Sequence, residues 1–208
     1  METHTVPDIV VGRLPHYLRI LQIMHRAGQK NTSSQELSQR LGFTAAQIRK
    51  DLSQFGEFGK QGTGYSIPFL LQHLETILNL NSLWQMVLVG VVGHAIARYQ
   101  GFTNRGFRIA AIFDTAPEKI GLQIGDYLIQ DWACAPLFIQ ENKIQLAMLT
   151  VPANQAQEVA NALVAAGIKA ILSYAPAIIT LPNQILIKYI DPLIELQHMT
   201  YYLDQDPR

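Results

Sequence analysis

The stretch MVLVGVVGHAIARY, Met86–Tyr99, decides how the larger part of this chain folds. An apolar run ends at Gly90, a second glycine follows at Gly93, and the residues after it have helical spacing. A strand that passes through glycines into a helix N-terminus is how a dinucleotide-binding turn begins. The full fingerprint is G-x-G-x-x-G, and these two glycines do not fill it in either register. The sequence leaves two interpretations open, a bound dinucleotide and a plain strand–helix turn.

Some residues around this turn favour a bound dinucleotide, and others favour a plain turn. Counted from Gly90, the middle position of the fingerprint is Val92, whose methyl groups would stand where backbone has to approach a pyrophosphate. Backbone N–H groups at a helix N-terminus nevertheless attract phosphate whatever the side chain. The acidic residue expected ~20 positions on is present as Asp114, which could accept hydrogen bonds from ribose hydroxyls. His94 can be read as a surface residue of the first helical turn or as a ligand contact. The candidate cofactor-binding residues of this region are Gly90, Val91, Val92, Gly93, His94, Ala95 and Asp114.

From residue 86 onward, short apolar segments alternate with helical ones, and this alternation predicts a parallel, doubly wound sheet. The predicted strands are residues 86–90, 107–113, 127–130, 144–151, 170–174 and 185–190. The predicted helices are residues 94–100, 133–141 and 154–166. Residues 152–153 and 175–176 follow strand ends, where open α/β sheets bind ligands, although ordinary loops have the same composition.

The N-terminal part has helical spacing instead. Apolar residues recur every three or four positions in residues 14–28, 33–43 and 44–56, and each of these segments contains or ends at a glycine. Ser33 with Glu36, and Thr44 with Gln47, have the spacing of capping boxes. Three short helices with a tight connection at Gly42 predict a helix-turn-helix. The glycine-rich EFGKQGTGYSI, residues 57–67, then predicts the two-stranded ribbon of a wing, and residues 68–80 predict a closing helix.

The third of these helices offers hydrogen-bond donors for DNA. Arginine can read guanine edges and lysine pairs with phosphate, while a solvated helix face is the alternative interpretation. Basic residues slightly outnumber acidic ones through residue 79, although the formal net charge of the whole chain is zero. The candidate DNA-binding residues are Gln47, Arg49, Lys50 and Ser53 on the helix, and Lys60 at the tip of the predicted wing.

Composition excludes several classes of protein. The single cysteine, Cys134, cannot form an internal disulfide, and its apolar neighbours predict a small buried residue. There is no secretory signal and no apolar run of the ~20 residues that a membrane helix needs, so we expect a soluble, cytoplasmic protein without a membrane partner. Nucleophile–base pairs, metal-ligand spacing and paired carboxylates are missing from the sequence, which argues against an enzyme.

Taken together, the motifs resemble those of the redox-sensing transcriptional repressors called Rex, from about Val6 to Leu203. The specific segments are RLPHYLRIL, SSQELSQRLGF, AAQIRKDLSQFGEFGK, GTGYSI, FDTAPEKIG, TVPANQAQEVANALVAAGIKAIL and IELQHMTYYL. The resemblance implies a homodimer with an N-terminal winged helix, a Rossmann domain and a C-terminal helix swapped between subunits. It further implies a repressor that binds an inverted-repeat operator, is released from DNA by NADH and binds DNA in the presence of NAD⁺.

The resemblance also carries over roles to single residues. It places Arg49, Lys50, Ser53 and Lys60 in DNA-contact segments and Tyr99 near the nicotinamide of NAD(H). It makes Arg19 and Asp191 a pair that links the DNA-binding domain of one subunit to the cofactor domain of the other. From the residues alone, Asp191 can equally be a cap for the apolar helix that follows it.

The sequence departs from the family pattern at three places, one of which is APAIIT, residues 175–180, where the arginine often found in the family is absent. Strand and helix at the glycine turn are joined by two residues fewer, and the wing has Gln61 where family members usually carry arginine. The shortened turn predicts weakened NADH binding. A Rex-like DNA-binding protein that no longer responds to NADH is therefore one alternative, and a nicotinamide-dependent enzyme with an appended DNA-binding domain is a more distant one.

The expected fold class is α/β, with a winged helix-turn-helix domain followed by a Rossmann-like parallel-sheet domain and a swapped C-terminal helix. The expected bounds are residues 1–80 for the DNA-binding domain, 84–191 for the NAD(H)-binding domain and 192–208 for the dimerisation helix.

Overall fold

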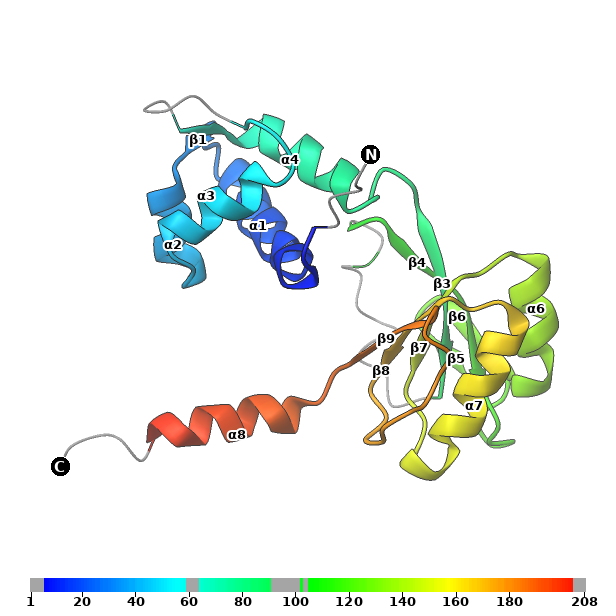
Figure 1. The fold of residues 1–208 in the computed structure, drawn as a ribbon. Helices are drawn as coiled ribbons and strands as arrows, with labels where there is room; N and C mark the ends of the chain where they lie inside the picture. The colour runs from blue at the N-terminus through cyan, green and yellow to red at the C-terminus, as the bar shows by residue number, and fades with distance from the viewer. Residues whose placement is uncertain (1–5, 59–63, 91–101, 103–104, 204–208) are drawn as a thin grey trace. The chain divides into compact units, whose positions relative to one another are not determined.

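The computed structural model describes residues 6–58, 64–90, 102 and 105–203 of the chain (Figure 1). These residues form two compact units, Met1–Ser82 and Leu83–Arg208, and each is treated by itself below. The first unit is helical and the second is built around a sheet, as the sequence predicts.

The described residues of the first unit form four helices and two very short strands. The helices are α1 Asp8–Arg26, α2 Ser34–Leu41, α3 Ala45–Ser53 and α4 Ile67–Ile77, and the strands are β1 Asn31–Thr32 and β2 Tyr65–Ser66. Ser33 Oγ accepts a hydrogen bond from the Glu36 amide at 3.1 Å, and Thr44 Oγ1 accepts one from the Gln47 amide at 3.2 Å. These contacts confirm the predicted N-termini of α2 and α3, because each hydroxyl satisfies an amide that the helix itself leaves unpaired.

The core of the first unit comes from one face of each helix. Side chains that are almost fully buried meet there from α1, α2, α3 and α4, including Leu14, Leu21, Leu37, Ile48, Ile67, Leu70 and Leu74. Burying an aliphatic side chain of this size contributes about 1.5–3 kcal/mol relative to exposure, so this cluster supplies the main stabilisation of the helical unit.

The strand pairing near the expected wing differs from the sequence prediction. The ribbon was expected within residues 57–67, but β2 pairs antiparallel with β1, which precedes α2, with Thr32 opposite Tyr65. Gly64 lies beside this pair with a φ of +73°, and a Cβ on it would overlap the Thr32 carbonyl oxygen. The pairing therefore requires glycine at position 64. Lys60 and Gln61 lie outside the described residues.

The second unit is a seven-stranded sheet with the order β5-β6-β4-β3-β7-β8-β9. Its strands are β3 Trp84–Val89, β4 Phe107–Asp114, β5 Gln123–Ile124, β6 Tyr127–Asp131, β7 Leu146–Leu149, β8 Ala170–Ser173 and β9 Leu186–Tyr189. All pairings are parallel except that of β5 with β6. The chain starts at β3 and winds to one side through β4 and β6, then returns to the other side through β7, β8 and β9. This is a Rossmann-like order with its switch point between β3 and β7.

Helices cover the sheet, and the described ones confirm their predicted places. They are the 3₁₀ helix η2 Trp132–Cys134, α6 Ala135–Glu141 and α7 Ala153–Ala166. In Figure 1, α6 and α7 lie on the same side of the sheet, and their apolar residues share one buried cluster with Val87, Phe113 and Leu149. A second cluster contains Leu88 and Ile112. The helix predicted near residues 94–100 lies outside the described residues.

The C-terminal helix α8, Pro192–Leu203, leaves its apolar side chains exposed within the chain. Leu193, Ile194, Leu196 and Met199 each retain 56–61% of their accessible surface. Exposed apolar side chains gathered on one helix are characteristic of a surface that meets a partner.

Two further sequence expectations can be compared with the structure. Cys134 was expected to be buried, and this is wrong: it is exposed at the end of η2, because Ala135 and Ile139 on α6 face the core instead. Among the described residues, no helix combines the length and the apolar character that crossing a membrane requires.

Candidate nucleic-acid and nucleotide sites

Helix α3 presents the predicted DNA-binding side chains on the outside of the first unit. Arg49, Lys50 and Ser53 are exposed and Gln47 is half-buried. Arg49 Nη1 donates to Ser34 Oγ on α2 at 3.0 Å, and Ser53 Oγ donates to the Lys50 carbonyl oxygen at 2.8 Å. The structure thus brings these four residues onto one helix, with Arg49 held toward the start of α2.

A buried polar triad attaches α3 to α1. Both guanidinium nitrogens of Arg13 that face Asp51 donate to its carboxylate, at 2.6 and 2.7 Å, and Tyr17 Oη donates to it at 2.6 Å. Burial alone would raise the pKa of Asp51, but the hydrogen bonds from Arg13 and Tyr17 outweigh it and hold that pKa below its ordinary value. Burial, followed by the bond to Asp51, raises the pKa of Tyr17. Asp51 is therefore an ionised anchor that fixes the position of α3.

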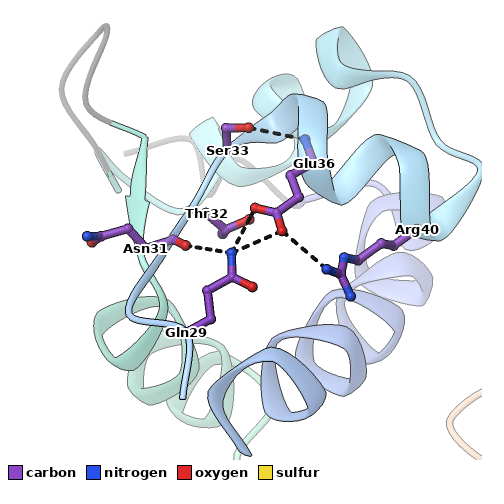
Figure 2. A network of polar contacts seen from close by, with 6 residues as sticks. All are labelled: Gln29, Asn31, Thr32, Ser33, Glu36 and Arg40. Atoms are coloured by element: carbon purple, nitrogen blue, oxygen red, sulfur yellow. Dashed lines mark hydrogen bonds and ion pairs between the residues drawn. The ribbon is translucent and has the colours of Figure 1, made fainter. Parts of the chain in front are cut away.

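A second polar network organises the chain between α1 and α2 (Figure 2). The carboxylate of Glu36 accepts from Gln29 Nε2 at 2.9 and 3.0 Å and from Thr32 Oγ1 at 3.0 Å, and Arg40 lies 3.3 Å away. The hydrogen bond from Gln29, aided by those from Thr32 and Arg40, lowers the pKa of Glu36 despite its partial burial. The network joins the end of α1, strand β1 and the first turn of α2. It therefore holds the start of α2 in place against the segment that follows α1.

The second unit has a pocket of about 210 Å³ at the carboxyl ends of β3, β4 and β7. This is the switch point of the sheet, where open α/β folds bind their ligands. Its described lining includes Gly90, Asp114, Lys119, Trp132, Thr150 and Pro152.

Gly90 cannot be replaced by another residue type without strain. Its φ is +85°, and an added Cβ would lie 2.8 Å from the carbonyl carbon and oxygen of Thr150 and 2.9 Å from Val151 Cγ1. The Thr150 hydroxyl donates to the Gly90 carbonyl oxygen at 2.6 Å, and the Thr150 amide donates to Val89 at 2.8 Å. Glycine after β3 thus lets the backbone pass close to the end of β7.

Asp114 closes β4 and lies at the edge of the same pocket. One carboxylate oxygen accepts from the Ala116 amide at 2.9 Å, and the other lies 3.3 Å from Lys119 Nζ. The Asp114 side chain is 7% exposed and that of Lys119 is 40% exposed. Each carboxylate oxygen has further acceptor capacity, so Asp114 can still accept from hydroxyl groups of a ligand.

The structure brings some of the predicted cofactor residues together and leaves others undescribed. Gly90 and Asp114 line one pocket, and Pro152, which follows β7, lines it too, whereas Ala175 and Pro176 are not among its lining residues. The remaining candidates, Val91, Val92, Gly93, His94, Ala95 and Tyr99, lie outside the described residues. Sequence reasoning missed Thr150, Lys119 and Trp132. Only Lys119 had a usable signal, since a lysine five residues after the strand-ending Asp114 falls near the same sheet edge.

The two residues of the implied inter-domain pair can each be placed locally. Arg19 is exposed on α1, and Asp191 is exposed just before α8. Asp191 Oδ1 accepts from the Leu193 amide at 2.9 Å, so it caps α8, as one of the two interpretations predicts. The two residues belong to different units of the chain, and their pairing stays a prediction.

Two protein families match different parts of the chain. Residues 5–53 match a family described as a putative DNA-binding protein N-terminus, and residues 81–177 match a family described as a CoA binding domain.

Similar proteins cover almost the whole chain. A redox-sensing transcriptional repressor Rex of Chloroflexus aurantiacus is 54% identical over 96% of this chain and 95% of its own length. That of Carboxydothermus hydrogenoformans is 38% identical over 99% of this chain and all of its own. Among solved structures, a protein called RSP in complex with NADH is similar with a TM-score of 0.89 at 35% identity, over 98% of this chain and 96% of that one. RSP with NAD⁺ and operator DNA has the same TM-score at 37% identity, over 98% and 94%. The chain belongs to the Rex family of redox-sensing transcriptional repressors.

Proposed function

We propose that this protein is a transcriptional repressor that senses the balance of NADH and NAD⁺, binding operator DNA with NAD⁺ and leaving it when NADH binds. One observation carries the proposal: RSP, whose similarity covers 98% of this chain, has been crystallised both with NADH and with NAD⁺ and operator DNA. The relatives are named repressors, which is a role without catalysis and speaks against the enzyme alternative.

The first unit supports the DNA half of the proposal. Helix α3 is attached to α1 by the Arg13–Asp51 pair and exposes Arg49 and Lys50. A helix held rigidly in this way can place Arg49 at base edges and Lys50 at a phosphate. We assign DNA contacts to Gln47, Arg49, Lys50, Ser53 and, on the wing, Lys60.

The second unit supports the nucleotide half. Its pocket lies at the switch point of the sheet, has glycine where β3 enters it, and has an acceptor carboxylate, Asp114, at its edge. These features fit the ribose and pyrophosphate of a dinucleotide. We assign NAD(H) contacts to Gly90, Asp114 and Tyr99 and to the turn of residues 91–95. The shortened turn offers fewer amides to phosphate and weakens the affinity for NADH.

The exposed helix α8 supports a homodimer. Its apolar side chains are not buried against other parts of the described chain. A second copy of the same chain presents the same apolar surface, so two copies can bury these side chains against each other. Two copies related by a two-fold axis present two α3 helices, which suits an operator with an inverted repeat. In such a dimer Arg19 of one subunit and Asp191 of the other couple DNA binding to nucleotide binding.

The test is a titration of the purified protein on DNA. Duplexes that the protein enriches from a random pool are labelled, and binding is followed by fluorescence anisotropy with NADH or NAD⁺ added. We expect NADH to weaken DNA binding and NAD⁺ not to do so, and Asp114→Asn to need more NADH for the same release. DNA binding that ignores NADH would instead identify a Rex-like protein that has lost this response. Steady consumption of NADH would identify an enzyme.

A further inference from the structure

Asp114 and Lys119 are the charged residues in the described lining of the pocket. Their charged groups lie 3.3 Å apart, and the Asp114 side chain is almost buried whereas the Lys119 side chain is 40% exposed. The charge at this edge of the pocket therefore depends on the pair as a whole, and on where the Lys119 side chain points.

An unpaired carboxylate at the end of β4 selects between two kinds of dinucleotide. It accepts hydrogen bonds from the hydroxyl groups of a ribose, and it repels a phosphate ester on the same ribose. NADH has the hydroxyl and NADPH has the 2′-phosphate at that position, while the rest of the two molecules is the same. Asp114 alone would hence strongly disfavour NADPH.

Lys119 changes this electrostatic balance. The fixed contact of Asp114 is the Ala116 amide at 2.9 Å, which holds one oxygen in place independently of Lys119. The lysine has a flexible four-carbon stem and a partly exposed side chain, so its ammonium can turn from Asp114 toward an anion. A phosphate beside Asp114 would find this cation within reach.

We propose that Lys119 is the specificity-determining residue of the pocket and provides the contact for the 2′-phosphate, so that NADPH is a second, weaker ligand of the same site. This inference rests on the proposed binding of NADH. It assigns opposite preferences to two neighbouring side chains: Asp114 favours the 2′-hydroxyl and Lys119 favours the 2′-phosphate.

The measurement is the ratio of the dissociation constants of NADPH and NADH, obtained by isothermal titration of the full chain. We expect Lys119→Gln to raise this ratio by about tenfold or more, since a charge-assisted contact to the phosphate is lost. Lys119→Arg should keep the ratio close to that of the natural protein, and Asp114→Asn should lower it. Because the shortened glycine turn meets both ligands alike, it cancels from the ratio.

The control is Lys169→Gln, which removes the same charge from an exposed lysine just before β8, at the opposite end of the parallel strands. It should leave the ratio unchanged. Adenosine 2′,5′-bisphosphate and 5′-AMP, titrated in the same way, should show the same change on Lys119→Gln without any nicotinamide. An unchanged ratio in Lys119→Gln, or NADH binding with no measurable NADPH binding by the natural protein, would overturn the inference alone. Failure of every nucleotide to bind would overturn the proposed function.

Discussion

Arg13 and Asp51 form a two-point ion pair, at 2.6 and 2.7 Å, between the first helix of the chain and the helix that carries the candidate DNA contacts. The pair and Tyr17 make Asp51 a structural carboxylate in a helix whose other charged residues face solvent. Within α3, Asp51 thus fixes the position of the helix, whereas its neighbours Arg49 and Lys50 are exposed and remain available for DNA.

Asp51→Asn should destabilise the first unit by about 3 kcal/mol, because it leaves the Arg13 guanidinium without its buried counter-charge. The natural protein should also lose stability in acid. The folded-state pKa of Asp51 lies below its unfolded value, so the contribution is complete above about pH 4 and is lost as the pH falls through the folded pKa. Hydrogen exchange of the α3 amides against pH measures both effects. Glu57→Gln, at an exposed site, is the control, and equal acid sensitivity of Asp51→Asn and the natural protein would contradict the assignment.

Gly90→Ala should destabilise the second unit by about 3 kcal/mol, since it combines a left-handed backbone with overlap against Thr150. Gly121→Ala is a matched control: its φ of +83° is nearly that of Gly90, but nothing lies within 4 Å of the added Cβ. Denaturant unfolding of the two variants separates close packing from backbone strain. Equal losses in both would show that the approach to Thr150 contributes little.

Lys50→Ala and Lys60→Ala should weaken DNA binding to a similar degree across different DNA sequences, because both are assigned to phosphates. Each should lower the slope of log K against log salt by about one. Anisotropy titrations at several salt concentrations give the slopes, with Lys169→Ala in the other unit as the control. Slopes that stay the same in both variants would reject the phosphate assignment.

Deletion of Pro192–Arg208 should abolish the dimer and leave an exposed apolar groove, which we expect to cause aggregation or a molten second unit. Sedimentation and near-ultraviolet circular dichroism measure assembly and packing. Removal of residues 204–208 alone, which keeps all of α8, should leave the dimer intact. A soluble, folded monomer from the longer deletion would show that α8 is not the dimer contact.

Restoring the glycine turn should tighten NADH binding. With Gly-Val-Gly-Asn-Val-Gly in place of Gly90 to Gly93, we expect at least about a tenfold gain. Each recovered hydrogen bond to a charged phosphate is worth about 1.5–3 kcal/mol. Isothermal titration of both proteins decides the matter. Equal or tighter binding by the natural chain would mean that the shorter turn is fully functional.

The elements that could be predicted from the sequence are those with a local cause. Ser33 and Thr44 cap α2 and α3, because a cap needs only a hydroxyl three residues before the amide that donates to it. The apolar run that begins at Met86 forms most of β3, because its side chains are buried on both faces of the sheet. The pairing of β1 with β2 has no such cause. It joins two strands of two residues each across the whole helix-turn-helix, and no periodicity fits in so short a segment.

The candidate site divides in the same way. Gly90 and Asp114 were identifiable since each ends a strand with a chemically distinctive residue, and parallel strands end at one edge. Thr150 could not be identified, because its hydroxyl donates to the carbonyl oxygen of Gly90, which is far away in the sequence. Nothing in the sequence near Thr150 indicates that contact. The Arg13–Asp51 pair was missed for a related reason: charged residues on amphipathic helices usually face water, and their separation in sequence hides the contact.

The pairing of β1 with β2 also brings together the two ends of the segment from Ser33 to Gly64. We therefore expect that this segment can be exchanged as one piece. The corresponding segment of a relative could be grafted onto the α1 and α4 framework, transferring its operator preference while the nucleotide-binding unit stays untouched. The graft must retain the groups that hold this segment to that framework. They are an aspartate at position 51 for Arg13 and Tyr17, a glutamate at position 36 for Gln29, a glycine at position 64 beneath Thr32, and the apolar side chains at positions 37 and 48 that enter the shared core.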